Sequence, residues 1–275
     1  MPEGDTIHKI ASFLAPRLAG ETVHDLAIGN DASARRWGQK RAAEWARECK
    51  GCKIRGVEAR GKHLFIDFDN GVSVRSHLGM YGAWHRYRAG DDWQKPKART
   101  SLVLTIGDEV YVCFNAREVE LLRSTGIRRR IIDTRLGPDL LGPDPDYSAV
   151  LRRARQIPDP EATVVDVLLD QRVASGIGNV YKSEVLFINR RLPQTRVGEI
   201  DDDELRRHFE LAAELLRRNL GGGKRITRFE SDAAGRLWVY RRAGQPCLRC
   251  DDGRIASAVT GRHHRSTYWC PRCQQ

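Results

Sequence analysis

The second residue of the chain, Pro2, offers chemistry that no other residue type can supply at that position. Removal of Met1 leaves a proline whose nitrogen is a free secondary amine. Such an amine attacks an aldehyde-like carbon and forms an iminium ion, which is cationic without holding a proton and is an electron sink for elimination. A terminal amine has a pKa of about 8, far below that of lysine, so part of it is unprotonated near neutrality. The sequence therefore predicts a nucleophile at Pro2; the alternative is a Met-Pro start without catalytic meaning.

Two Cys-x-x-Cys pairs near the end of the sequence have the spacing of a metal site. Each pair can turn two sulfurs toward one ion, and the stretch between the pairs can form a hairpin that brings them together. Four thiolates leave no coordination position open, so we expect a single structural zinc ion in place of a hydrophobic core. The four predicted ligands are Cys247, Cys250, Cys270 and Cys273.

The net charge of the chain favours a polyanionic partner. Lys and Arg number 47 against 36 Asp and Glu, which gives a formal charge of +11. This surplus is typical of proteins that bind nucleic-acid phosphates, although a basic protein without such a partner has the same balance. Residues 236–275 are especially rich in arginine, so we expect the zinc hairpin to grip DNA. Arg265 is predicted at its tip, with His263 and His264 at the surface or facing DNA.

No stretch of the sequence is long and apolar enough to cross a membrane, and no secretory signal is present. We therefore expect a cytoplasmic, nucleoid-associated bacterial protein whose cysteines are thiols or metal ligands. Cys49 and Cys52 form a third Cys-x-x-Cys pair that lacks partners for a zinc cage. We interpret them, with Cys113, as free thiols; the alternative is a redox role.

The periodicity of apolar residues changes along the first half of the chain. Residues 3–18 have helical spacing, and the stretches after them alternate with period two and are separated by turn residues. This pattern predicts a helix followed by an antiparallel β-sandwich. The alternating runs and their turns are 64–68, Asn70-Gly71, 72–74, 102–106, Gly107-Asp108 and 110–114.

The second half returns to a helical period, so the fold class is predicted as α+β. We expect an N-terminal catalytic domain over 1–135, a linker over 136–147, a helical DNA-binding domain over 148–235 and a zinc finger over 236–275. The predicted helices are 148–156, 162–170, 178–188 and 201–219.

One connection between the helices has the composition of a phosphate-binding loop. In residues 171–180, Gly176 and Gly178 would let backbone amides approach a phosphate closely, and Asn179 would stand near the start of the next helix. An ordinary helix connection with glycines is the alternative interpretation.

Taken in order, these motifs resemble the formamidopyrimidine-DNA glycosylase/endonuclease VIII family of base-excision repair enzymes. The matching segments are Pro2-Glu3-Gly4, Gly61-Lys62, 76–80, 176–179 and 265–274. The Met-Pro-Glu-Gly start is similar to the endonuclease VIII branch. The resemblance implies a helix–two-turn–helix motif in the helical domain over 148–235. It also implies a monomeric enzyme that removes an oxidised base from damaged DNA and cuts the strand.

The resemblance also assigns roles to the reacting groups. Pro2 would attack the deoxyribose C1′ and displace the base, and the iminium would then promote β- and δ-elimination of the flanking phosphates. Glu3 matches the general acid/base. Lys62 matches a lysine that contacts phosphate and assists base release. Arg265 is the fourth residue that we expect in the catalytic site, after Pro2, Glu3 and Lys62.

Further residues match the family's DNA contacts. Asn179, with Arg265, corresponds to the clamp on the kinked backbone. Met80 matches a wedge that fills the gap left by the flipped base. Arg117 matches the arginine that faces the estranged base, and Tyr81 stands beside the wedge.

Departures from the family pattern narrow the expected substrate. Val119 stands where the 8-oxoguanine branch usually has phenylalanine, and Glu120 replaces a usual glycine. The stretch 221–240 is too short for most of the loop that covers 8-oxoguanine. We therefore expect oxidised pyrimidines to be favoured. Thr6 occupies the position of a family glutamate.

Two other functions remain open at this point. One is a zinc-containing protein that binds damaged DNA without catalysis, against which the intact Pro2, Glu3 and Lys62 argue. The other is a lyase that cuts abasic sites with little base selectivity.

Overall fold

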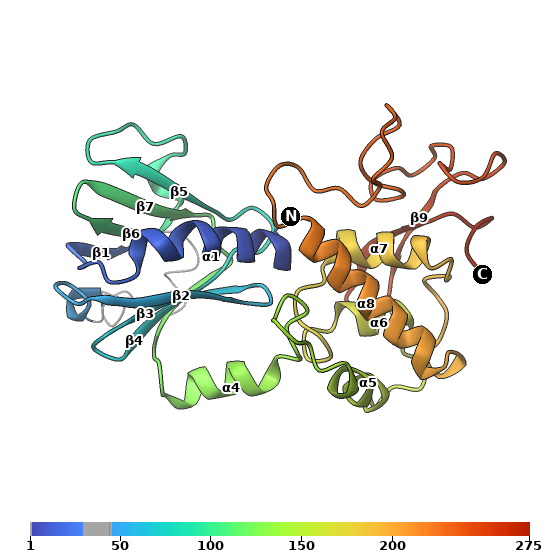
Figure 1. The fold of residues 1–275 in the computed structure, drawn as a ribbon, viewed down its shortest axis with the longest axis horizontal. Helices are drawn as coiled ribbons and strands as arrows, with labels where there is room; N and C mark the ends of the chain where they lie inside the picture. Colours follow the sequence, from blue (N-terminus) through green and yellow to red (C-terminus); the bar gives the residue numbers. More distant parts are fainter. Residues whose placement is uncertain (1, 30–43, 45) are drawn as a thin grey trace. The chain divides into compact units, whose positions relative to one another are not determined.

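The chain folds into two compact units, Met1–Thr134 and Arg135–Gln275, in a computed structural model that describes residues 2–29, 44 and 46–275 (Figure 1). Eight strands lie in the first unit, and the second is mainly helical among the described residues. This is the α+β class that the two periodicities predict.

Two four-stranded antiparallel sheets build the first unit, with the strand orders β1-β6-β7-β5 and β2-β3-β4-β8. Asn70 and Gly71 turn the chain between β3 and β4, and Gly107 and Asp108 turn it between β6 and β7, as predicted. The strands are Asp25–Ile28 (β1), Ile54–Arg60 (β2), His63–Phe68 (β3), Val72–His77 (β4), Ala83–Arg88 (β5), Thr100–Ile106 (β6), Glu109–Phe114 (β7) and Glu118–Arg123 (β8).

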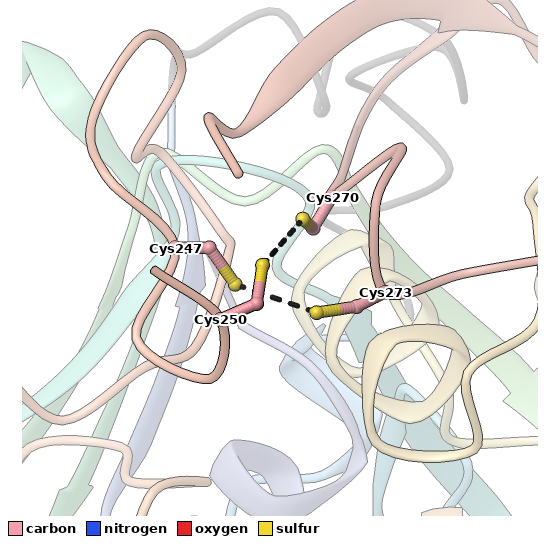
Figure 2. Close-up of side chains that lie close together, drawn as sticks. All are labelled: Cys247, Cys250, Cys270 and Cys273. Carbon is pink, nitrogen blue, oxygen red and sulfur yellow. Dashed lines mark hydrogen bonds between the residues drawn. The ribbon is translucent and has the colours of Figure 1, made fainter. Parts of the chain in front are cut away.

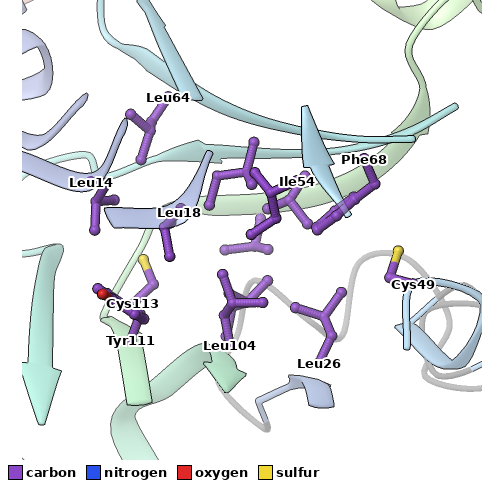
Figure 3. Packing of buried hydrophobic residues seen from close by; sticks show 14 of the residues in the cluster. Leu14, Leu18, Leu26, Cys49, Ile54, Leu64, Phe68, Leu104, Tyr111 and Cys113 are labelled. Atoms are coloured by element: carbon purple, nitrogen blue, oxygen red, sulfur yellow. The ribbon is translucent and has the colours of Figure 1, made fainter. Parts of the chain in front are cut away.

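Helix α1, Gly4–Leu18, is anchored in the core that the two sheets enclose. Its apolar stripe includes Leu14 and Leu18, which are at most 1% exposed. Figure 3 shows both side chains close to Leu64 of one sheet and Cys113 of the other. Burial of each such leucine stabilises the fold by about 2 kcal/mol. The packing therefore fixes the helix and, with it, the residues at its start.

Helix α4, Ile127–Arg135, has no apolar stripe that would predict it. Ion pairs and a cation–π contact hold this helix against the second sheet. The guanidinium of Arg129 lies 3.8 Å from the centre of the Phe65 ring and pairs with Asp67 and Asp133 at 3.3 Å each, and also with Glu58. Arg129 is 6% exposed, so α4 covers the face of the second sheet that alternation assigns to solvent.

The second unit contains the four predicted helices, and α5 and α8 each begin at an aspartate whose side chain caps the first turn. Asp146 accepts from the N–H of Ala149 at 2.8 Å, and Asp201 accepts from the N–H of Glu204 at 2.7 Å. These bonds satisfy orphan donors of the first turns. The elements are Tyr147–Arg155 (α5), Val164–Leu169 (α6), Asn179–Ile188 (α7), Asp202–Arg218 (α8) and the hairpin strands Ala256–Thr260 (β9) and Arg265–Trp269 (β10), with a short 3-10 turn at Val197–Glu199. Another 3-10 turn, Lys97–Arg99, belongs to the first unit.

The stretch expected to be a linker, 136–147, contributes to the second unit. Leu140 is fully buried in its core, and the N–H of Gly137 donates to the carbonyl of Gln171 at 2.8 Å. The domain boundaries proposed from the sequence stay a prediction.

Candidate functional site

Pro2 and Glu3 stand at the first turn of α1. Pro2 is half-buried, whereas Glu3 is fully buried and is the N-cap residue. The Glu3 carbonyl accepts from the N–H groups of Thr6 at 3.0 Å and Ile7 at 3.2 Å. The partial positive charge of a helix start favours a carboxylate there. A carboxyl group is thus held one residue from Pro2 on a helix that cannot move without disturbing the core.

Thr6 does not supply the carboxylate that the family pattern has at its position. Its hydroxyl donates to Asp5 Oδ1 at 3.3 Å, and Asp5 is 1% exposed. The acidic group of this turn therefore comes from Asp5, the neighbouring residue.

Lys62 lies in the two-residue turn between β2 and β3. Arg60 and His63 are paired across the turn, and Gly61 has a φ of +55°, in the left-handed region that glycine adopts readily. The half-buried Lys62 is therefore held where β3 begins.

Met80 and Tyr81 project from a tight turn between β4 and β5. The N–H of Gly82 donates to the Leu78 carbonyl at 3.1 Å. Met80 is 47% exposed and Tyr81 76% exposed, which is unusual for large apolar side chains. The turn therefore presents two large side chains to solvent.

The structure brings the base of the Arg117 side chain against that turn. A Cβ on Gly79, which has a φ of +63°, would lie 2.8 Å from Arg117 Cβ. Only glycine permits this approach. The Arg117 side chain is 65% exposed, so it is accessible beside Met80.

Two histidines that the sequence reasoning missed lie beside Lys62. His63 and His77 are opposite each other on β3 and β4, with ring centroids 5.0 Å apart. Arg75 Nη1 lies 2.9 Å from His63 Nδ1, and because a guanidinium only donates, this nitrogen accepts. Burial lowers the pKa of His63 well below its usual value and that of His77 to about 4, and the nearby cations act in the same direction. Both rings are therefore neutral near pH 7.

Glu120, a departure from the family pattern, pairs with two arginines. Its side chain is fully buried, and it accepts from Arg75 Nε and from Arg128 Nε at 2.7 Å each. Arg75 Nη2 also donates to Glu118 Oε2 at 2.7 Å. These ion pairs join β4, β8 and α4. In the sequence, these residues alternate with apolar ones along β4 and β8, and this alternation places them on one face of the sheet.

Glu120→Gln is expected to lower the free energy of unfolding by about 2 kcal/mol, because it leaves buried Arg75 with one charged partner fewer. Urea denaturation measures the change. Glu48→Gln is the matched control, since its partner Arg123 is 3.1 Å away and both side chains are about half exposed. The control should lose less than about 0.5 kcal/mol. Equal losses in the two variants would contradict the role given to the buried pair.

In the second unit, the predicted glycine-bearing loop leads into α7. Gly178 is the N-cap residue, Asn179 is the first helical residue, and Gly176 has a φ of +115°. Asn179 Nδ2 donates to the carbonyl of Ser266 at 2.8 Å. Ser266 follows Arg265, the exposed first residue of β10. The fold therefore brings the predicted residues Asn179 and Arg265 to one place.

Glu184 of α7 is a buried anchor that the sequence reasoning missed. It accepts from the N–H groups of Trp238 (2.8 Å), Val239 (2.9 Å) and Tyr240 (2.8 Å) and from the Thr227 hydroxyl. Burial raises the pKa of Glu184, and these donors oppose that effect. Glu184 thereby fixes the chain that leads from α8 to the cysteine cluster.

The four predicted cysteine ligands converge (Figure 2). Cys247 Sγ and Cys273 Sγ are 3.8 Å apart, as are Cys250 Sγ and Cys270 Sγ, and all four sulfurs lie within 4.8 Å of one another. Four sulfurs at about 2.3 Å from a tetrahedral zinc ion stand about 3.8 Å apart. The donor set and its spacing therefore fit zinc.

The backbone around the four sulfurs also fits closely against them. A Cβ on Gly253 would lie 2.6 Å from both Cys250 Sγ and Cys270 Sγ, so only glycine fits there. The N–H of Arg249 donates to Cys247 Sγ at 3.4 Å, a bond that supports a thiolate. His263 and His264 lie exposed in the β9–β10 turn.

The remaining cysteines are free thiols, as predicted, and Cys49 and Cys113 are buried in the core of the first unit. Burial, chiefly, raises the pKa of Cys49 to about 12. A thiol that stays protonated is a poor nucleophile, which argues against a redox role.

Comparison with known proteins gives matches along nearly the whole chain. Models of the Formamidopyrimidine-DNA glycosylase N-terminal domain and of the Formamidopyrimidine-DNA glycosylase H2TH domain match residues 1–120 and 136–231. A "Probable endonuclease 8 2" of Streptomyces coelicolor is 37% identical over 279 residues, covering 100% of this chain and 94% of that protein. A "DNA-(apurinic or apyrimidinic site) lyase Nei2" of Mycolicibacterium smegmatis is 35% identical, with 100% and 99% covered.

Solved structures agree on the fold. A complex between Lactococcus lactis Fpg and abasic-site DNA matches with a TM-score of 0.82 at 21% identity, and 100% of both chains is covered. The chain therefore belongs to the formamidopyrimidine-DNA glycosylase/endonuclease VIII family, in its endonuclease VIII branch. It is accordingly an enzyme of the DNA glycosylase/AP lyase class that acts in base-excision repair. Among the described residues, none of the helices is long and apolar enough to span a bilayer.

Proposed function

We propose that the protein is a bifunctional glycosylase/lyase in which Pro2 is the nucleophile. The observation that carries the proposal is the juxtaposition of Pro2 with buried Glu3 at the start of a helix anchored in the core. An amine and a proton-transfer group one residue apart, both held by α1, are what iminium chemistry at a sugar requires.

The reaction proceeds as a displacement followed by two eliminations. The Pro2 nitrogen forms a bond to C1′ while the bond from C1′ to the base breaks, and the base leaves with a proton taken from water. The Glu3 carboxylate takes the proton that the Pro2 nitrogen loses after its attack. Opening of the sugar ring then gives the iminium, and Glu3 passes that proton to the ring oxygen. Loss of a C2′ proton expels the 3′ phosphate, and loss of a C4′ proton then expels the 5′ phosphate. Water finally releases Pro2.

Lys62 and the wedge residues would prepare the substrate. Lys62, fixed in its turn, supplies a cation for a backbone phosphate near the reacting sugar. Met80 would enter the stack where the nucleotide has left it, and Arg117 would face the unpaired base opposite. Val119 has no aromatic ring and is only 4% exposed, so it cannot act as an aromatic wedge. Exposed Tyr81 supplies an aromatic ring beside Met80 instead.

Asn179 and Arg265 would clamp the phosphate backbone. The start of α7 carries partial positive charge, which favours a phosphate there. Gly176 and Gly178 are buried, and the Gly176 N–H donates to Gln171 Oε1 at 3.2 Å, so the glycines shape the loop before α7. We propose that one Zn²⁺ bound by the four cysteines holds the hairpin that presents Arg265. One copy of the chain contains every proposed group, so we expect a monomer that acts on chromosomal DNA at the nucleoid.

Oxidised pyrimidines are the proposed substrates, supported by Val119 in the wedge region and the short 221–240 stretch. A lyase with little base selectivity is the second candidate, since one similar protein carries the name of an abasic-site lyase. A panel of single- and double-stranded oligonucleotides with thymine glycol, 8-oxoguanine or a plain abasic site separates the two. Faster cutting of thymine glycol than of 8-oxoguanine is expected, and cutting of abasic DNA alone would favour the second candidate.

Arg265→Ala is expected to reduce the slope of log affinity against log salt by about 0.9, which corresponds to one lost phosphate contact. The measurement is titration of abasic-analogue DNA at several salt concentrations. Arg272→Ala, which removes the same charge near the cysteine cluster, is the control and should leave the slope unchanged. An unchanged slope for Arg265→Ala would mean that this side chain does not touch the backbone.

A further inference from the structure

Lys182 on α7 is completely buried, although lysine is rarely buried at all. Its ammonium group donates to Asn179 Oδ1 at 2.8 Å, to the Ser266 carbonyl at 3.2 Å and to Thr267 Oγ1 at 2.6 Å. These three neutral oxygens come from the start of α7 and from β10. Lys182 therefore joins the two elements that carry the proposed phosphate clamp.

The contact with Lys182 fixes the orientation of the Asn179 side chain. An ammonium group has donors and no acceptor, so the oxygen of the Asn179 amide, and not its nitrogen, must face Lys182. The amide nitrogen then points its first hydrogen at the Ser266 carbonyl, which accepts at 2.8 Å. Asn179 is 8% exposed, and the second hydrogen of the same nitrogen is the one that would meet a phosphate. Lys182 and the Ser266 carbonyl hold the amide together, because a half-turn would place its nitrogen against the ammonium group and its oxygen against the carbonyl.

The same ammonium group also fixes the backbone beside Arg265. Ser266 is the next residue along β10, and its carbonyl accepts from both Asn179 and Lys182. The hydroxyl of fully buried Thr267 lies 3.2 Å from the Arg265 carbonyl and contacts Lys182 on its other side. The start of β10 is thereby fastened to α7 through Ser266 and Thr267.

We propose that Lys182 is a positioning residue for phosphate recognition. It orients the Asn179 amide and the Arg265 backbone toward one phosphate of the damaged strand, and its buried charge strengthens the field at that phosphate. Burial makes such a charge more effective than one in water, because the surrounding medium screens it less. The inference rests on the proposed function. A lysine that only fastens α7 to β10 would act on stability alone.

A thermodynamic cycle between protein and DNA separates these roles. One arm compares wild type with Lys182→Met, which keeps the length of the side chain but removes its donors and charge. The other arm compares normal duplex DNA containing a tetrahydrofuran abasic analogue with duplexes in which one flanking phosphate is a neutral methylphosphonate. On normal DNA, Lys182→Met should weaken binding about 30-fold, the range of a lost charge-assisted network. On DNA with the clamped phosphate neutralised, the loss should shrink to about threefold or less.

Asn219→Ala controls for simple loss of stability. Asn219 is 3% exposed, lies in the same unit and bonds to Leu215 and Ile226, away from the clamp. It should lower the melting temperature but change binding by less than about threefold on every DNA. If Lys182→Met does not fold, Lys182→Gln, which restores a donor without the charge, replaces it in the cycle. If Lys182→Met loses the same affinity on normal and methylphosphonate DNA, or loses none, the proposal is overturned. Failure of wild type to prefer abasic DNA would instead contradict the proposed function.

Discussion

Cys270→Ser is expected to release the zinc ion, unfold the β9–β10 hairpin and weaken binding to abasic DNA by at least about a hundredfold. Binding of structural zinc contributes about 10 kcal/mol or more to folding of such segments. The apolar cluster around the cysteines is small, with Phe187, Val239 and Ile255 as its other buried members. It cannot hold the hairpin without the ion, and loss of the hairpin removes Arg265 together with the Ser266 carbonyl that orients Asn179.

Metal content by atomic emission and binding by fluorescence anisotropy give the two readouts. Cys52→Ser is the matched control, because Cys52 is a half-buried thiol of the first unit and lies in no metal cluster among the described residues. It should keep one zinc per chain and normal affinity. A Cys270→Ser protein without zinc that binds abasic DNA as tightly as wild type would refute the role of the cluster.

Blocking the Pro2 nitrogen is expected to lower the rate of strand cleavage by at least about a thousandfold, since an amide nitrogen cannot form an iminium. The sharpest comparison uses one preparation with a removable N-terminal extension, assayed before and after proteolysis exposes Pro2. Affinity for an uncleavable abasic analogue should change by less than about threefold between the two forms. Loss of rate without loss of binding distinguishes a missing nucleophile from a misplaced N-terminus.

Pro2→Gly tests the nature of the amine. Glycine leaves a primary amine that forms an imine, so cleavage should be weakened while DNA binding stays normal. Equal cleavage by the extended and exposed forms would mean that the nucleophile is elsewhere.

The helices and strands predicted from periodicity are those that pack one face of apolar residues against a core. The α1 stripe packs on one core, and β3, β4, β6 and β7 alternate between a buried and a more polar face. Strand β2 escaped prediction because its register shifts between Ile54 and Gly56, which breaks the period of two. Helix α4 escaped it because ion pairs hold the helix.

Buried charges explain most of what the sequence did not reveal about the site. Arg75 and Glu120 occupy the polar face of β4 and β8, which alternation assigns to solvent, but α4 covers that face. Lys182 lies in a helix whose residues 179–187 are all buried, because β10 also packs on α7. Each partner is distant in sequence, so no local pattern pairs them. Pro2, Glu3 and the cysteine pairs could be identified from the sequence, because their chemistry depends on position or spacing alone.

Mass spectrometry of a borohydride-quenched reaction tests the central claim most directly. Exposed wild-type protein is incubated with a lesion-bearing oligonucleotide, reduced, digested and sequenced. We expect the sugar remnant to be attached to the nitrogen of Pro2. Attachment to Lys62 or another lysine, or no covalent product at all, would contradict it.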